Sequence, residues 1–179
     1  MVFTVTLDFK DKINDSVLKE VEKSIKMLSG AKVYSGVIGE DERTTRMAYE
    51  NEYGWGSVYD WGPFEGYPVQ DPQRPFISAP IEKNAEHIGS VLSSWINNSL
   101  NTKKIEQVLK KCGQMMSELQ TTSILSRGSN IGGWNQFNGG RVGEHNSGMT
   151  VKTKGFDFPL LDRHHNPFPI KYEVELGGA

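Results

Sequence analysis

Apolar and polar residues alternate near both ends of this chain of 179 residues. Residues 3–9 and 170–176 each carry an apolar side chain at every second position. Because successive side chains of a β-strand point to opposite faces, this period of two predicts two strands with one apolar face each. A third, less regular strand candidate covers residues 33–38. Half-buried strands at both termini are typical of one antiparallel sheet that the two ends share.

Three segments between these strand candidates carry apolar residues at every third or fourth position, which is the spacing of one helix face. They cover residues 17–28, 81–96 and 105–119. Asn14 or Asp15 can cap the first helix, and Gly30 lies just past its end. Residues 98–102 separate the other two helices, which we therefore expect to form an antiparallel pair.

The composition suits one globular domain with a modest core, because 36% of the residues are apolar and 23% are charged. The predicted fold class is α+β, an antiparallel sheet packed by two to four helices, with long irregular loops. We expect a single domain over residues 1–179. The lone cysteine, Cys112, has no partner for an intrachain disulfide and lies on an apolar stripe, so we expect a small core side chain.

Two long segments show neither the period of two of a strand nor the three- to four-residue spacing of a helix face. Residues 53–75 contain four prolines and the aromatic residues Trp55, Trp61, Phe64 and Tyr67, and residues 127–149 contain seven glycines. Loops of this length in a compact domain are usually functional or disordered. The aromatic content of the first favours a surface that another protein covers, and a loop packed on its own domain is the alternative. The glycines of the second indicate flexibility.

The charge balance and the hydropathy exclude several classes of protein. Twenty Lys and Arg stand against 22 Asp and Glu, a net charge of -2, so the chain has no surplus of positive charge for tight nucleic-acid binding. No stretch approaches 18 apolar residues, and the N-terminal residues lack the pattern of a signal peptide. We therefore expect no membrane association, and folding in a cytoplasm.

The residue patterns predict no catalytic, cofactor-binding or metal-binding site. Of the four histidines, His87 has no second helical histidine four residues away and is expected to face solvent, and His145 lies in the glycine-rich segment. Residues 162–169 faintly resemble the His-Asn centre of a ββα-metal nuclease, but the adjacent His164 and His165 would point in opposite directions in an extended chain. No serine-nucleophile elbow or phosphate-binding loop is present in the sequence. We therefore expect that the protein is not an enzyme.

Three stretches, taken in order, resemble the tail-completion or neck family of tailed bacteriophages. They are residues 48–54 (AYENEYG), 73–77 (QRPFI) and 146–162 (NSGMTVKTKGFDFPLLD), of which the third is the most specific. The chain departs from the family pattern at Asn51, where the family has histidine, in the long insertion 53–72, and after Asp162.

The residues of these stretches also make physical sense as a scaffold. Gly54 can supply a positive φ after a helix, and Pro75 can set the first turn of the next helix. Arg74 offers a planar fork for carboxylates or carbonyls where segments meet.

The resemblance implies a structural subunit, repeated as a ring between the head connector and the tail tube. The ring would be a hexamer, or alternatively a dodecamer, in contact with neck, connector and tail-tube proteins, and double-stranded DNA would pass through it without its sequence being read. The protein would lie in the virion, and in the host cytoplasm during assembly. The residues expected at interfaces are Trp55, Trp61, Phe64, Tyr67, Arg74, Phe76 and Val174. The alternatives are a phage-associated metal-dependent nuclease and a monomeric adaptor that binds through the aromatic loop.

Overall fold

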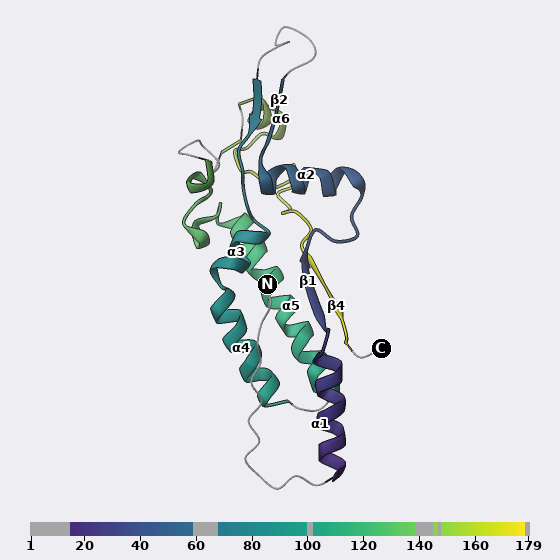
Figure 1. Cartoon of the computed structure of the whole chain (residues 1–179). Coiled ribbons are helices and arrows are strands. Elements are labelled where there is room, and N and C mark those ends of the chain that lie inside the picture. Colours follow the sequence, from purple (N-terminus) through teal and green to yellow (C-terminus); the bar gives the residue numbers. More distant parts are fainter. Residues whose placement is uncertain (1–14, 59–67, 100–101, 139–144, 147, 178–179) are drawn as a thin grey trace. The chain divides into compact units, whose positions relative to one another are not determined.

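The computed structural model describes residues 15–58, 68–99, 102–138, 145–146 and 148–177 (Figure 1). The predicted strand at residues 3–9 lies outside these ranges. The chain groups into two compact units, one formed by Met1–Ser35, Asn84–Ser117 and Lys171–Ala179, the other by Gly36–Lys83 and Glu118–Ile170. The single-domain expectation stays a prediction, and each unit is described by itself.

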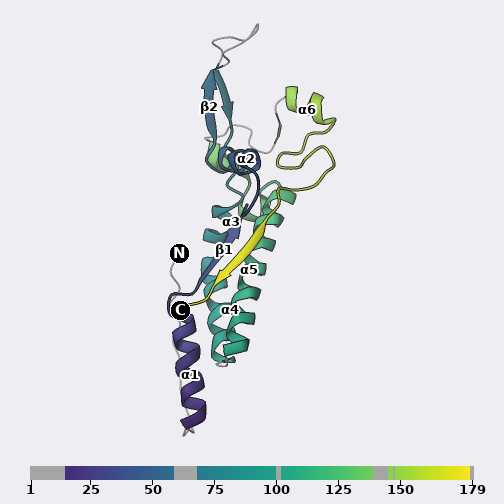
Figure 2. The same ribbon diagram turned by 90° about the vertical axis from the view of Figure 1, so that its right-hand side faces the viewer.

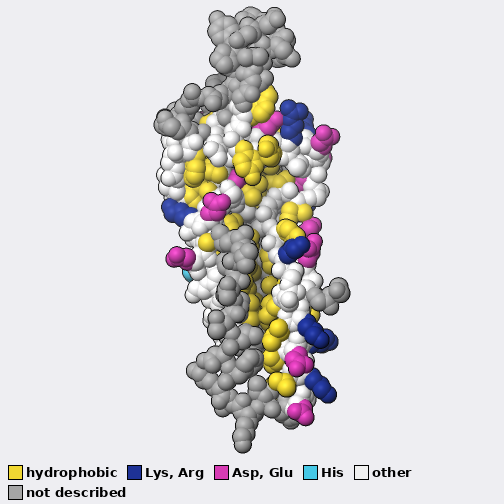
Figure 3. Space-filling model, viewed as in Figure 1, with side chains coloured by type: hydrophobic (Ala, Val, Ile, Leu, Met, Phe, Trp, Pro, Cys, Tyr) yellow, Lys and Arg dark blue, Asp and Glu magenta, His cyan; other side chains and the backbone are white. Residues whose placement is uncertain are grey.

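The first unit contains the predicted helices and two of the predicted strands. Helix α1 (Asp15–Leu28) ends before Gly30, whose φ is +82° as the predicted end of the helix requires. In Figure 3 the charged side chains of α1 lie along one side of the helix and the apolar ones along the other. The apolar side chains of Val17, Leu18 and Ile25 are exposed.

Helices α4 (Ala85–Asn97) and α5 (Thr102–Leu125) run side by side (Figures 1 and 2) and confirm the predicted pair. Their apolar stripes are buried, and Cys112 is 2% exposed, so the expected core role of this cysteine is confirmed. Burial raises the pKa of its thiol. The predicted helix 81–96 is in fact two helices, because Asn84 leaves helical geometry between α3 (Ser78–Lys83) and α4.

Strands β1 (Lys32–Gly36) and β4 (Lys171–Glu175) pair in a two-stranded sheet and confirm the strand candidates at 33–38 and 170–176. Tyr34 Oη donates a hydrogen bond to Glu175 Oε2 at 3.2 Å. The ring of Tyr172 packs against Gly113 of α5, where a Cβ atom would lie 2.5 Å from the ring. The sheet therefore packs on α5 at a point that requires glycine.

The second unit contains elements that the periodicity did not predict. Helix α2 (Glu42–Tyr53) begins at the N-cap Asp41, whose side chain accepts a hydrogen bond from Thr44 N at 3.0 Å. Helix α6 covers Gly148–Lys154. The core of this unit gathers eight buried residues from separate segments: Ala48, Phe76, Ala79, Ile124, Ile131, Trp134, Leu160 and Leu161.

The expectation that residues 53–75 are irregular is wrong at both ends of the segment. Strands β2 (Trp55–Val58) and β3 (Pro68–Asp71) pair antiparallel from Trp55 opposite Asp71 to Val58 opposite Pro68. The strands are four residues long, and Pro68 stands at a strand end, where a missing N–H is tolerated. Such short strands give no periodic signal in the sequence.

The expectation that residues 127–149 lack regular structure is also wrong for part of the described segment, whereas the expected flexibility of its glycines stays a prediction. Two 3₁₀ helices cover Ser129–Ile131 and Trp134–Asn138. Gly128 has a φ of +77°, and a Cβ atom there would lie 2.5 Å from the buried ring of Trp134. This glycine allows a left-handed turn and close packing at the same position.

The fold class is confirmed as a small α+β fold with helices that pack on a two-stranded antiparallel sheet. The described residues form six α-helices, more than the two to four expected.

Candidate functional site

The guanidinium of Arg74 joins three distant segments of the second unit. Its Nη1 donates to Asn51 Oδ1 of α2 at 2.9 Å, and its Nη2 donates to the carbonyl oxygen of His145 at 3.0 Å. The residue is only 6% exposed. The expected planar fork for carbonyl oxygens is confirmed, because both of these acceptors are carbonyl or amide oxygens.

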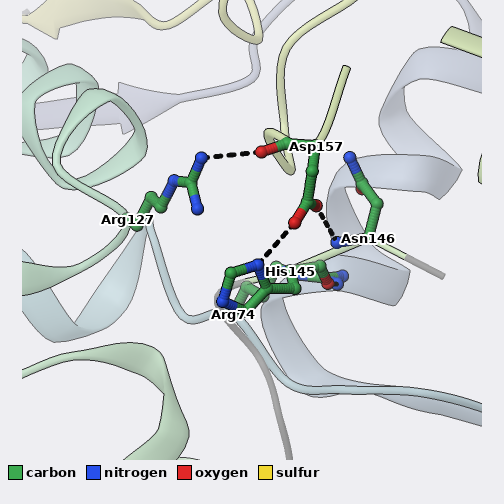
Figure 4. Close-up of polar contacts among 5 residues, drawn as sticks. All are labelled: Arg74, Arg127, His145, Asn146 and Asp157. Atoms are coloured by element: carbon green, nitrogen blue, oxygen red, sulfur yellow. Dashed lines mark hydrogen bonds and ion pairs between the residues drawn. The ribbon is translucent and has the colours of Figure 1, made fainter. Parts of the chain in front are cut away.

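The carboxylate of Asp157 lies beside this junction (Figure 4). Its Oδ1 accepts from Asn146 N at 2.7 Å, and its Oδ2 is 2.5 Å from His145 Nδ1. The backbone carbonyl of Asp157 accepts from Arg127 Nη2 at 2.6 Å. The hydrogen bond from Asn146 N, followed by that from His145, holds the pKa of Asp157 below its usual range. Segment 145–157 is therefore closed into a loop by one aspartate.

Glu52 joins the end of α2 to the start of α3. Its Oε2 accepts from Ile77 N and its Oε1 from Ser78 N, each at 2.8 Å, and the residue is 3% exposed. Gly54 follows α2 with a φ of +72°, as predicted. The role predicted for Pro75 is wrong, since α3 begins at Ser78 and Pro75 lies before it.

A pocket of about 750 Å³ opens next to these contacts, within the second unit. One face of α2, one face of α6 and residues 160–169 form its walls. Its apolar lining includes Met47, Leu160, Leu161 and Phe168, and its polar lining includes Arg74, Asn146 and Lys154. Lys154 Nζ donates to the carbonyl oxygen of Leu161 at 2.6 Å. Burial, followed by the charge of Arg74, lowers the pKa of Lys154.

Residues 162–169 form a turn around Asp162. Its Oδ1 accepts from Asn166 N at 2.9 Å and from His164 N at 2.7 Å, and the bond from Asn166, followed by that from His164, lowers the pKa of the carboxyl. The ring of His165 stacks on Phe156 at 4.2 Å between centroids. Nowhere in the described ranges do three His, Cys, Asp or Glu side chains form a group that could hold a metal ion.

The structure brings few of the predicted interface residues to the surface. Trp55 is 39% exposed at the start of β2, and Val174 is half-buried in β4. Phe76 is 0% exposed and packs on Phe168, so it is a core residue that no partner can reach in this conformation. The guanidinium of Arg74 bonds within the chain, to Asn51 and to the carbonyl oxygen of His145. Trp61, Phe64 and Tyr67 lie outside the described residues.

The sequence patterns did not indicate one exposed aromatic pair. Tyr49 and Tyr53 of α2 are 65% and 60% exposed, and their rings lie 4.8 Å apart. Their spacing of four residues on a helix would have indicated the contact if α2 had been predicted. His87 is exposed on α4, as expected.

Comparisons with known proteins add no relative. A scan against protein-family models, a search of curated proteins and a search of solved structures each give no match for this chain. Among the helices of the described residues, none is long and apolar enough to cross a lipid bilayer. The fold and the site thus define a small α+β protein in which buried polar side chains hold separate segments together.

Proposed function

We propose that this chain is a structural virion protein of a tailed phage, which joins head and tail as a ring in the neck or at tail completion. The observation that supports this most is that the three stretches resembling that family contribute to one buried core, with Ala48 from the first, Phe76 from the second, and Leu160 and Leu161 from the third. Glu52 and Asn51, from the first stretch, bond to residues of the second or next to it. Arg74, from the second, bonds to His145 beside the third.

The chemistry of these contacts is that of a scaffold. Glu52 binds two backbone N–H groups and Arg74 binds two oxygens, while Asp157 closes the third stretch on itself. Buried groups such as those of Glu52 and Arg74 fix geometry through bonds within the chain. In the proposed ring, partners would meet other surfaces, such as the β2–β3 hairpin and the exposed rings of Tyr49 and Tyr53.

Microscopy of the virion tests the proposal directly. A tag on the chain, detected by gold label or as extra density in a reconstruction of the neck, is expected in six copies, or in twelve on the portal side, arranged as a closed ring. Virions that carry a single copy, or an open patch without symmetry, would rule the ring out.

A paired set of variants tests the hairpin as a contact surface. Trp55→Ala together with Trp61→Ala should leave the chain folded and block the joining of heads to tails, because aromatic anchors carry much of the energy of interfaces. Phe137→Ala is the matched control, since Phe137 is 38% exposed and lies outside the hairpin. Normal yields of infectious particles from the double variant would show that the hairpin is dispensable.

The nuclease alternative makes an opposite prediction. Purified protein with Mg²⁺ or Mn²⁺ is expected to leave plasmid DNA intact. Cleavage that disappears on changing both His164 and His165 to alanine would favour the nuclease over the ring protein.

A further inference from the structure

Asn146, one of the residues that line the pocket of the second unit, carries a buried side-chain amide with incomplete hydrogen bonding. The backbone N–H of Asn146 is taken by Asp157, whereas the buried side-chain Nδ2 finds no acceptor among the described residues. Buried amide donors in proteins nearly always have a partner. A rotation of this side chain toward the pocket would let an acceptor of a bound molecule satisfy the donor.

The pocket also contains an ammonium group in an unfavourable setting. Lys154 Nζ has three donors, of which one reaches the carbonyl oxygen of Leu161. Burial and the neighbouring charge of Arg74 both lower the pKa of Lys154, while Asp162 partly opposes them. A second anion next to Lys154 would stabilise its charged form.

Two acidic side chains of the pocket lining accept hydrogen bonds from donors other than Lys154. Glu50 accepts from Arg46 Nε at 2.8 Å, and Asp162 accepts from the backbone of its own turn. The rest of the wall is mixed, with Leu160, Leu161 and Phe168 as apolar contributors beside polar side chains such as Thr150 and Asn166. A concave, mainly apolar pocket with a few convergent polar groups is the usual form of a binding site.

We propose that this pocket binds a carboxylate that a partner protein presents next to an apolar side chain, with Lys154 and Asn146 as the donors. The carboxylate can come from the C terminus of the partner or from an acidic side chain. The identification of the partner as a neighbouring virion protein rests on the proposed function, whereas the binding chemistry does not.

Three short peptides and the full chain test the binding. The probes are acetyl-leucyl-phenylalanine with a free carboxylate, the same peptide as its C-terminal amide, and acetyl-glutamyl-phenylalaninamide. Binding is followed by amide chemical shifts at up to about 10 mM peptide, because such small ligands bind weakly. We expect one carboxylate peptide to bind at least about tenfold more tightly than the neutral amide, and the peptide that binds identifies the source. Equal affinity for all three, or no binding of any, would overturn the inference.

Variants of helix α6 assign the donor. Lys154→Gln removes the charge but keeps a donor for Leu161, and should weaken binding about tenfold. Lys152→Gln is the matched control, because Lys152 is exposed on the same helix and does not line the pocket. Asn146→Ala, which retains the backbone N–H bound to Asp157, should also weaken binding. Unchanged affinity in Lys154→Gln would contradict the assignment.

Titration of Lys154 gives a readout that a purely structural lysine would not show. Bound carboxylate should raise the pKa of Lys154, observed through its side-chain carbon shifts, and binding should fade as the pH rises through that pKa. The other titratable or charged groups that line the pocket are Glu40, Glu50, Arg74, His145 and Asp162. A pKa of Lys154 that the peptide does not move would refute the site.

Failure of this inference and failure of the proposed function are distinguishable. Peptide binding by a chain that is missing from purified virions would leave the pocket assigned and refute the neck role. A chain found in the neck ring that binds none of the peptides would support the neck role and refute the binding assigned to the pocket.

Discussion

Replacing Glu52 with alanine tests whether the bonds between the stretches stabilise the second unit. Each carboxylate oxygen accepts one backbone N–H at 2.8 Å, from Ile77 and Ser78, at a site with 3% exposure. Alanine removes both acceptors and offers no replacement. Because an unsatisfied donor costs about 1–3 kcal/mol when it is shielded from water, we expect the free energy of unfolding to fall by about 2–5 kcal/mol.

Urea unfolding and hydrogen exchange measure this loss. With a slope of about 2 kcal/mol per molar urea, a loss of about 3 kcal/mol lowers the midpoint by about 1.5 M. Glu50→Ala is the control on the same helix, since it removes only a surface ion pair with Arg46, worth about 0.5 kcal/mol or less. Amide exchange at Ile77 and Ser78 should accelerate in Glu52→Ala alone. Equal midpoints for the two variants, with unchanged exchange, would refute the stabilising role.

Three further changes test packing and charge. Gly128→Ala meets both a φ of +77° and an indole ring 2.5 Å from the new Cβ atom, so thermal unfolding should show a cost of about 3 kcal/mol or more, against about 1 kcal/mol for Gly39→Ala, where φ is +66° and the space is open. Gly113→Ala should cost about 1–3 kcal/mol, and a double-mutant cycle with Tyr172→Ala should recover part of it. Asp157 has a lowered folded-state pKa, so its contribution is present above the unfolded-state pKa and is lost as the pH falls through the folded one. Stability should therefore decline less steeply with acid in Asp157→Asn, and parallel pH curves would contradict this.

Helices α1, α4 and α5 and strand β4 could be predicted because their apolar residues repeat with the period of the element. Helix α2 could not, since its buried residues are only Ala48 and Glu52, and its remaining signal is the cap at Asp41. A helix without an apolar stripe is stabilised by contacts that no local window contains. The N-cap pattern alone could have indicated where it begins.

The contacts of the site were harder to predict from the sequence than the helices and strands. The bonds of Arg74 join it to residues 23 and 71 positions away, and no spacing rule connects them. The planar fork of Arg74 was predicted from its chemistry, but its partners were not. Phe76 was expected at an interface, although an aromatic residue of this kind is equally suited to a core, and only the packing of distant segments decides between the two.

Buried polar contacts decide which packing of the loops the second unit adopts. Burial of Phe76, Trp134 and Leu160 is favourable in many arrangements, because the hydrophobic effect has no direction. The fork of Arg74, in contrast, is satisfied only when its two oxygens lie in the right plane, and a mispacked loop would leave a buried cation without acceptors. A subunit that meets identical copies in a closed ring, as proposed, requires such fixed surfaces.

Arg74→Lys separates these two contributions, since it keeps the charge and the core but loses the planar fork. We expect the variant to remain folded, with duplicated or broadened amide peaks in residues 145–157, because this segment loses the bond that selects one conformation. The same substitution at an exposed position of this unit, Arg43→Lys, should leave these peaks single, because Arg43 is exposed on α2. One sharp peak for each residue of that segment in Arg74→Lys would show that hydrophobic packing alone is sufficient to place the loop.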